Sequence, residues 1–206
     1  MSVHAFIYLA SQSPRRAQLL DLMGVAHRPL LAQADEDAES LEAERAAELP
    51  HDYVKRVTGA KLHAARERMR RRGLQTAPIL CADTSVALGR VVLGKPRDAA
   101  QATQMLQRLS GRTHRVLTAV AVHDGRRAQH ALSITKVRFS ELPPAVIAAY
   151  IASGEPFGKA GSYAIQGALA GWIERIDGSH SSVMGLPLFE TTQLLKAAGV
   201  ALALAA

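Results

Sequence analysis

The strongest constraint on the fold of this chain is a buried strand that leads directly into a helix near the N-terminus. The apolar residues Phe6 to Ala10 predict the strand. Pro14 then begins a helical pattern that stops at Gly24, with Ser13 at the N-cap position before it. Units of this kind build α/β folds, in which helices pack against a sheet.

The turn between this strand and helix also carries a chemical signal. Arg15 and Arg16 fall in the first helical turn, where the dipole makes a cation unfavourable by about 0.3–1 kcal/mol. A bound anion removes that cost, and phosphate suits a point where backbone donors, a Ser hydroxyl and guanidinium groups converge. The alternative is a solvated pair of surface arginines, and the hexapeptide Ser11 to Arg16 does not decide between the two.

The rest of the chain alternates between helical and extended patterns. We expect helices over residues 51–72, 98–109, 143–153 and 187–198, and extended segments over 28–33, 79–82, 86–93, 115–123, 131–139 and 172–176. Asp124-Gly125 is a hairpin signal, so two of these strands are antiparallel. The order therefore predicts the α/β class with a mixed sheet.

Composition limits the organisation of the chain. With 206 residues, 48% of them hydrophobic, the chain is long enough for one core, and we expect a single domain over residues 1–206. The single Cys excludes an internal disulfide, and the first residues lack the pattern of a signal peptide. No apolar run approaches the roughly 20 residues of a membrane helix. We therefore expect a cytoplasmic protein that does not bind membranes.

The net charge of +7 raises the possibility of nucleic-acid binding. Much of this charge lies at the end of the helix expected over residues 51–72, at Arg66, Arg68, Arg70, Arg71 and Arg72. Cations favour the dipole at a helix C-terminus, and a solvated helix end explains them. Aromatic residues are only 4% and do not interleave with the basic residues, which disfavours a stacking platform for single strands. Nucleic-acid binding stays the minor alternative.

Two groups of carboxylates are candidates for chemistry. Asp83 ends the apolar strand expected over residues 79–82, and ligands of open α/β sheets collect beyond the carboxyl ends of strands. A turn cap is the usual role of such an Asp. Asp35, Glu36 and Asp37 lie in an acidic loop over residues 34–50, either as solvated charge or as hard oxygen ligands for a divalent cation. Neither group is specific alone.

Two lysines add to this pattern, because the chain uses arginine for most of its basic residues. Lys95 lies in an abrupt Gly-Lys-Pro turn, and Lys159 lies among small residues. A compact ammonium group in a tight loop suits a phosphate oxygen, although a surface lysine is the ordinary explanation for each. Their joint occurrence favours a phosphate site.

Together these segments resemble the Maf family of nucleoside triphosphate pyrophosphatases, from the first strand to the last helix. The matching segments are Leu9 to Arg16, Asp35-Glu36, the helix of Lys61, Ala82-Asp83-Thr84, Gly94-Lys95-Pro96, Leu109-Ser110-Gly111 with His114, Lys159-Ala160-Gly161, Tyr163 to Gly167 and Gly185-Leu186-Pro187. The resemblance implies a Maf/ITPase-like fold, with a central mixed twisted sheet flanked by helices and two lobes around an active-site cleft. It also implies cleavage of a nucleotide between its α and β phosphates.

The resemblance also implies residue roles. Asp83 would be the proton acceptor that activates water. The histidines show no zinc spacing, and we interpret His114 as a structural residue. Glu36 and Asp83 would hold Mg²⁺ or Mn²⁺, since both ions prefer oxygen ligands. The remaining roles are phosphate binding by Ser13, Arg15 and Arg16, and offset of the triphosphate charge by Lys61, Lys95 and Lys159.

Base choice divides the family at three positions of this sequence. Arg15, Thr84 and Gln166 resemble the branch that acts on dTTP and UTP, whereas the branch acting on 7-methyl-GTP has Glu in place of the Gln. A Gln amide can meet both the N3–H donor and the carbonyl acceptors of uracil or thymine, while an ionised Glu cannot donate. Hydrolysis of dTTP, UTP or modified pyrimidine triphosphates is therefore expected, with 7-methyl-GTP specificity as an alternative.

The chain departs from the family pattern at two places. The family usually has an acidic residue where this chain has Gly158, and the acidic loop around Glu39 to Glu48 is long. Both differences can alter the cleft. We expect a homodimer. A non-enzymatic nucleic-acid-binding or cell-division regulatory protein on the same fold is the rival from another class.

Overall fold

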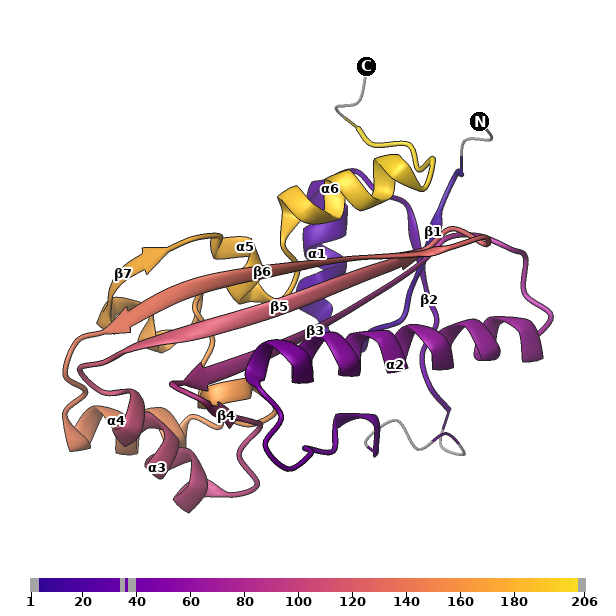
Figure 1. The fold of residues 1–206 in the computed structure, drawn as a ribbon. Coiled ribbons are helices and arrows are strands. Elements are labelled where there is room, and N and C mark those ends of the chain that lie inside the picture. Colours follow the sequence, from indigo (N-terminus) through magenta and orange to yellow (C-terminus); the bar gives the residue numbers. More distant parts are fainter. Residues whose placement is uncertain (1–3, 34–35, 37–39, 204–206) are drawn as a thin grey trace.

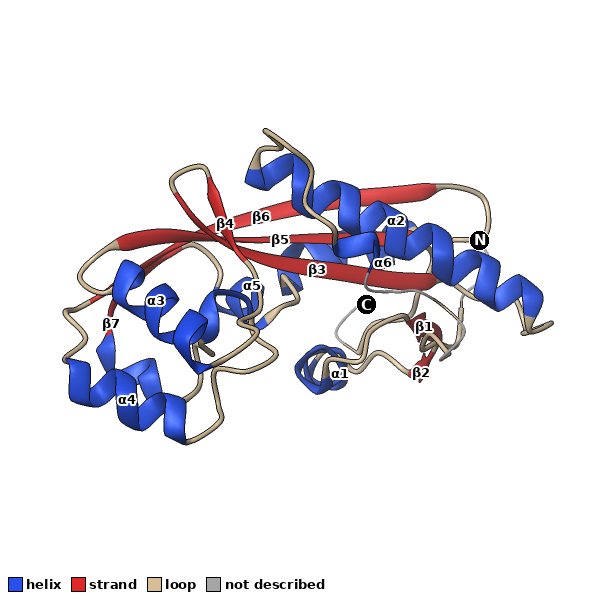
Figure 2. Cartoon of the chain, turned by 90° about the horizontal axis from the view of Figure 1, so that it is seen from below, coloured by secondary structure: helices blue, strands red, loops and turns tan. Residues whose placement is uncertain are grey.

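The computed structural model describes residues 4–33, 36 and 40–203, and its centre is one seven-stranded mixed sheet flanked by helices (Figures 1 and 2). The strand order is β2-β1-β3-β5-β6-β7, and β4 pairs with β3 off this path. Strand β1 is parallel to β2 and β3, whereas the other pairs are antiparallel. The predicted α/β class with a mixed sheet is confirmed.

The elements follow the predicted order. The strands are β1 Ile7–Leu9, β2 His27–Pro29, β3 Ile79–Leu88, β4 Val91–Leu93, β5 Thr113–His123, β6 Ala128–Phe139 and β7 Ile173–Asp177. The α-helices are α1 Pro14–Leu22, α2 Pro50–Arg71, α3 Ala99–Leu109, α4 Pro144–Ala152, α5 His180–Met184 and α6 Leu188–Ala197, with short 3-10 helices at Ser40–Glu42, Ala160–Ser162 and Ala168–Trp172. Helix α5 has only five residues, too few for its periodicity to show in the sequence.

Helices cover both faces of the sheet. Helix α2 lies along one face, while α1 and α6 lie on the other (Figure 1). Apolar side chains of α1 and α6 form one core cluster with β1, β3 and β5, and those of α2 form another on the opposite face. A third cluster joins α3 and α4 to the far end of the sheet (Figure 2). The apolar core is therefore divided between the two ends of the sheet.

The strand–turn–helix unit at the N-terminus forms as predicted, but its cap differs. Ser13 has the extended backbone of an N-cap, yet its side chain makes no capping hydrogen bond. Its backbone N–H donates to the Ser11 hydroxyl at 3.2 Å, so the turn is held by Ser11. The Ser13 hydroxyl is therefore not committed to capping the helix.

Strand β3 is longer than the sequence predicts. Ile79 to Leu88 form one continuous strand, because residues Ile79 to Ala87 pair with β5 along their whole length. Asp83 therefore lies in the middle of a strand, and the prediction that it ends one is wrong. A turn-cap role for Asp83 is excluded by the same observation.

The neighbours of β3 leave a gap beside Asp83. On that side, β1 pairs with β3 only as far as Leu80, and β4 pairs only from Val86 onward. Between these two points no strand in the described part of the chain pairs with that edge. Successive side chains of a strand point to opposite faces. Because no described strand covers this edge, the side chains of Asp83 and Thr84 can reach the same cavity although they start on opposite faces of the sheet.

The other segments agree with expectation in outline. The Asp124-Gly125 signal does join β5 to β6, and Asp98 caps α3 by accepting from the Gln101 N–H at 2.7 Å. Near the C-terminus, Val200 is buried and bridges to His4, so this part of the tail is packed. None of the helices within residues 4–33 and 40–203 has the length and apolarity needed to span a membrane.

Candidate active site

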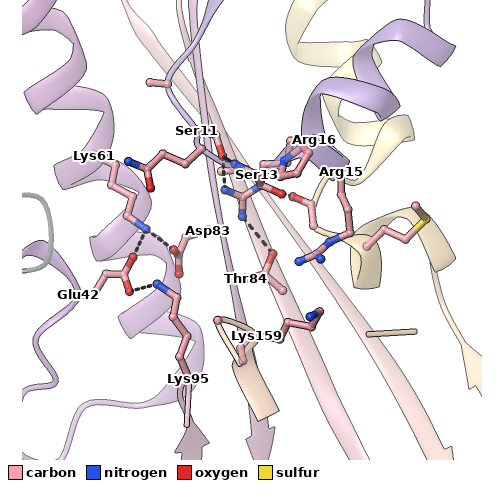
Figure 3. Close-up of a pocket in the computed structure, with 18 of the residues that line it drawn as sticks. Ser11, Ser13, Arg15, Arg16, Glu42, Lys61, Asp83, Thr84, Lys95 and Lys159 are labelled. Atoms are coloured by element: carbon pink, nitrogen blue, oxygen red, sulfur yellow. Dashed lines mark hydrogen bonds and ion pairs between the residues drawn. The ribbon is translucent and has the colours of Figure 1, made fainter. Parts of the chain in front are cut away.

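A cavity of about 500 Å³ opens at the uncovered edge of β3 (Figure 3). Its walls come from the turn after β1, the middle of β3, the inner face of α2 and the loop before the 3-10 helix Ala160–Ser162. Two carboxylates, Glu42 and Asp83, line it together with the six cations Arg15, Arg16, Lys61, Arg68, Lys95 and Lys159. This excess of cations favours a polyanionic ligand.

Four charged side chains form a continuous chain across one wall of the cavity. The Lys61 ammonium donates to Asp83 Oδ1 at 2.6 Å and to Glu42 Oε1 at 2.7 Å. The other carboxylate oxygen of Glu42 accepts from Lys95 Nζ at 2.8 Å. Figure 3 shows these contacts linking α2, β3 and the turn that follows β4.

Mutual attraction shifts the pKa values of Lys61 and Glu42. Burial alone lowers the pKa of Lys61, but the Asp83 and Glu42 carboxylates outweigh burial and raise it above its ordinary value. Burial alone raises the pKa of Glu42, but Lys61 and Lys95 outweigh that effect and lower it. Lys61 and Glu42 are therefore held in their charged forms near neutral pH.

Arg16 is fixed by protein groups on the opposite wall. Its Nε donates to the Gly185 carbonyl at 2.8 Å, and its terminal nitrogens donate to the hydroxyls of Ser11 at 2.9 Å and Thr84 at 3.4 Å. Burial lowers the pKa of Arg16, and the nearby Asp83 carboxylate opposes that shift. Arg16 is therefore a preorganised cation, in contrast to the solvated surface pair considered from the sequence.

Thr84 belongs to an ordered chain of hydroxyls. Thr118 donates its single hydroxyl proton to the Ser182 carbonyl at 2.7 Å, so it accepts from Thr84 at 3.0 Å. The Thr84 proton is thereby committed to Thr118. Toward the cavity, Thr84 can offer only a hydrogen-bond acceptor.

Arg15, Ser13 and Lys159 line the cavity as expected from the sequence. The Arg15 guanidinium points toward the loop of Lys159 (Figure 3). Lys159 donates to the backbone carbonyl of Glu155, and burial followed by the charge of Arg15 lowers its pKa. These two cations therefore face the same space.

The structure does not bring Glu36 to Asp83. Its carboxylate accepts from Arg68 at 2.6 and 2.8 Å and from Arg71 at 2.8 Å, beside Arg72 at 3.3 Å. Hydrogen bonds from Arg68 are the largest cause that lowers the pKa of Glu36 to about 2. These arginines of the helix end are not simply solvated, because they hold the acidic loop. Asp35 and Asp37, the other two acidic residues of that triplet, lie outside the described residues.

Gln166 is exposed and is not among the residues that line the cavity. It lies between Ile165, which does line the cavity, and Gly167. Its predicted role in base choice stays a prediction.

Gly158, where the family usually has an acidic residue, has a φ of +74°. Glycine adopts this conformation without strain, which gives a physical reason for glycine at this position.

His114 is a core residue, in keeping with the structural role expected for it. Its Nε2 is 2.7 Å from the Tyr163 hydroxyl, and its ring stacks on Phe139. Burial lowers the pKa of His114 to about 4. The imidazole is therefore neutral at physiological pH.

Sequence reasoning missed two residues of the cavity. Glu42 lies in the acidic loop, and no spacing in the sequence singles it out from its acidic neighbours. The sequence favours a solvated helix end for Arg68. Arg68 nevertheless follows Lys61 by seven residues, about two helical turns, and so lies on the same face of α2. That periodicity is the signal that identifies Arg68.

The protein groups of this cavity can hold a divalent cation only together with oxygen atoms of a bound substrate. Within residues 4–33, 36 and 40–203, no group of three His, Cys, Asp or Glu side chains could hold a metal ion. Mg²⁺ is commonly bound by one or two carboxylates together with substrate phosphates, and Asp83 supplies a hard oxygen on the cavity wall. Asp83 thus fits as a protein ligand to a metal that arrives with a phosphorylated substrate.

The fold and the cavity define an α/β protein with a cationic cleft whose wall carries the carboxylates of Glu42 and Asp83. The chain belongs to the family described as Maf-like protein, whose model matches residues 6–198. The resemblance stated from the sequence motifs is therefore confirmed.

Close relatives cover nearly the whole chain. A dTTP/UTP pyrophosphatase of Polaromonas sp. (strain JS666 / ATCC BAA-500) is 61% identical over 195 residues, which are 95% of this chain and 96% of the relative. One of Albidiferax ferrireducens is 59% identical over 194 residues, 94% of this chain and 97% of the relative. One of Burkholderia pseudomallei (strain 1710b) is 58% identical over 200 residues, 96% of each chain.

Proposed function

We propose that the protein hydrolyses dTTP and UTP to the nucleoside monophosphate and pyrophosphate. The observation that carries the proposal is the position of Asp83, a carboxylate on the wall of a cavity that six cations surround. The names of the relatives, at 58–61% identity over nearly the whole chain, support the substrate and the reaction. Modified pyrimidine triphosphates belong to the same proposal, because their phosphates and base edges present similar groups.

The cations bind and orient the triphosphate in this proposal. Ser13, Arg15 and Arg16 hold phosphate oxygens at the start of α1, where the helix dipole also favours an anion. Lys61, Lys95 and Lys159 approach from the other walls and offset the charge that develops on the leaving pyrophosphate. Arg16 needs little reorganisation, because three protein groups already fix its guanidinium.

Asp83 is the proposed proton acceptor. A carboxylate in the middle of a strand is held in place by the backbone on both sides, and the Lys61 ammonium orients it. Asp83 would take a proton from the water that attacks the α phosphate, and such general-base catalysis contributes typically 10²–10⁴-fold. The leaving group is pyrophosphate.

A divalent cation, Mg²⁺ or Mn²⁺, is part of the proposal. Asp83 would hold it together with the substrate phosphates, and the ion would neutralise phosphate charge and polarise the reacting phosphorus. The prediction that Glu36 is a second ligand requires its carboxylate to leave the arginines that surround it.

Base choice in this proposal rests on Arg15, Thr84 and Gln166. Thr84 offers an acceptor toward the cavity, which suits the N3–H donor of uracil or thymine. Cytosine has no hydrogen at N3, so an acceptor at this point disfavours it. Gln166 is proposed to meet the remaining edge of the base.

Three further points belong to the proposal. We expect the chain to form a single domain, to act in the cytoplasm and to form a homodimer. Light scattering after size exclusion tests the oligomeric state, and cell fractionation tests the location. Neither result bears on the reaction.

A nucleotide panel tests the proposed reaction. The protein is incubated with dTTP, UTP, CTP and 7-methyl-GTP in Mg²⁺ or Mn²⁺, and pyrophosphate and orthophosphate are measured separately. We expect pyrophosphate from dTTP and UTP and no turnover in excess chelator. Orthophosphate as the first product contradicts the proposal. A preference for 7-methyl-GTP supports the alternative specificity, and tight, salt-sensitive binding of nucleic acid without turnover supports the non-enzymatic alternative.

A further inference from the structure

Glu42 has a position that no sequence motif explains. Its two carboxylate oxygens accept from two different lysines, Lys61 at 2.7 Å and Lys95 at 2.8 Å. These lysines come from separate elements, α2 and the turn after β4, and both line the cavity. One side chain thus spans the distance between two cations that the proposed function assigns to the triphosphate.

The backbone around Glu42 is fixed to α2 by several contacts. The Tyr53 hydroxyl donates to the Glu42 carbonyl at 2.8 Å. The Arg56 guanidinium donates to the carbonyls of Leu41 at 3.4 Å and Ala43 at 2.9 Å, and pairs with Glu48 at 2.6 and 2.7 Å. The carboxylate is therefore presented by an anchored segment.

We propose that Glu42 is a positioning residue for the reaction, which holds the ammonium groups of Lys61 and Lys95 in place beside Asp83. The inference rests on the proposed function, because it gives Glu42 a role toward the two lysines of that mechanism. It differs from the role implied for Glu36, whose carboxylate lies among arginines.

The physical argument concerns the difference between binding and catalysis. A lysine that is no longer held still attracts phosphate, because charge acts over several ångströms. Stabilising charge that develops only in the transition state requires donors at fixed positions, and a displacement of about 1 Å can lower the rate by roughly 10²-fold. Loss of Glu42 should therefore reduce kcat more than it weakens substrate binding.

Removal of the negative charge also acts on KM. Glu42 is an anion in a cavity for an anion, so its replacement removes a repulsion from the substrate. For Glu42→Gln we expect kcat for UTP to fall roughly tenfold, with KM unchanged or lower. A purely structural role predicts a lower melting temperature with unchanged kcat per folded molecule.

The matched control is Glu44→Gln, which removes the same charge two residues away from an exposed side chain. We expect its kcat and KM to equal those of the wild type. Melting temperatures of both variants are measured to exclude unfolding. Wild-type release of pyrophosphate from UTP is the internal check: its absence would refute the proposed function, whereas an unchanged kcat of Glu42→Gln beside an active wild type would refute only the role of Glu42.

Tyr53→Phe gives a second, independent test. It removes the hydrogen bond to the Glu42 carbonyl and leaves all four charges of the chain in place. We expect a smaller fall in kcat, about threefold, and no additional fall when it is combined with Glu42→Gln, because both changes act through the same contact.

Two results would overturn the proposal. If Glu42→Gln lowers KM and the inhibition constant of pyrophosphate while kcat stays unchanged or rises, Glu42 competes with the substrate for the lysines. If Glu42→Gln and Glu44→Gln change kcat equally, only net charge matters. A tenfold fall in kcat that is confined to Glu42→Gln supports the positioning role.

Discussion

The ion pair between Lys61 and Asp83, at 2.6 Å, joins the middle of α2 to the middle of β3. Both residues are at interior positions of long elements, so the pair is held by the backbone hydrogen bonds of a helix and a sheet. Asp83, the proposed proton acceptor, is therefore held by regular backbone structure on both sides of the pair.

Asp83→Asn should lower kcat for UTP by at least about 10²-fold, because the amide cannot accept the proton. Lys61 keeps Glu42 as a partner, so we expect a folded variant with a modest loss in melting temperature. Asp177→Asn, at an exposed carboxylate in β7, is the control and should retain full activity. Near wild-type turnover of folded Asp83→Asn would remove Asp83 from the mechanism.

Glu36→Gln tests both the arginine contacts of this residue and its implied role as a metal ligand. The pKa of Glu36 is lowered from 4.5 to about 2, so its carboxylate stabilises the fold fully above pH 4.5. This contribution is lost as the pH falls toward about 2. In urea titrations between pH 4.5 and 2, we expect the variant to lose less stability than the wild type. A fall in kcat at neutral pH with saturating Mn²⁺ would support the ligand role, and an unchanged kcat would contradict it.

His114 should make the stability of the protein depend on pH in mildly acidic solution. Because burial lowers the pKa of His114 from 6.5 to about 4, the unfolded chain binds a proton that the folded chain does not bind in this range. Because of His114, we expect the free energy of unfolding to decrease by about 2 kcal/mol as the pH falls from 7.5 to about 5. His123, whose pKa is also lowered, acts in the same direction.

Urea unfolding at the two pH values checks this prediction. His114→Phe should show a clearly smaller difference between them than the wild type. Tyr163→Phe removes the hydrogen-bond partner but keeps the buried imidazole, so its difference should stay close to that of the wild type. Equal pH dependence of wild type and His114→Phe would show that the imidazole is not the source.

Gly161 should tolerate a side chain less well than Gly73, although both have a positive φ. A Cβ on Gly161 would lie 2.8 Å from Val86 Cγ1, and φ is +67°. At Gly73, φ is +58° and a Cβ would meet no described atom within 4 Å. Gly73→Ala should cost about 1–2 kcal/mol for backbone strain, and Gly161→Ala about 1–3 kcal/mol more, measured by urea unfolding. Equal losses would show that the contact with Val86 relaxes freely.

Gln166→Glu should change base choice. If residue 166 faces a bound base, an ionised Glu would leave an acceptor unpaired opposite a carbonyl of uracil, at a cost of about 1–3 kcal/mol, which corresponds to a tenfold to hundredfold loss in kcat/KM. Guanine presents donors at this edge, so the ratio of kcat/KM for UTP to that for 7-methyl-GTP should fall. Because Gln166 is exposed in the structure, an unchanged ratio would show that it does not face the base.

The order of the elements was predictable because each signal is local. Pro14 and Gly24 mark the limits of one helical pattern, and Asp124-Gly125 marks a hairpin whose strands form as expected. Local patterns failed at β3, where the polar residues Asp83 to Ser85 conceal a single long strand. Pairing with β5 decides that strand, and the β5 partners of residues 83–85 are more than thirty positions away in the chain.

The sequence by itself determined the mixed α/β fold, the family and most of the cations that line the cavity, because helix starts, tight turns and motif spacing are properties of neighbouring residues. Only the tertiary structure decided which carboxylates meet these cations. Glu36 lies among arginines and Glu42 lies beside Lys61 and Lys95, although both belong to the same acidic loop. The physical reason is that Coulombic contacts depend on distance in space, and contacts of Tyr53 and Arg56 with the loop backbone set that distance.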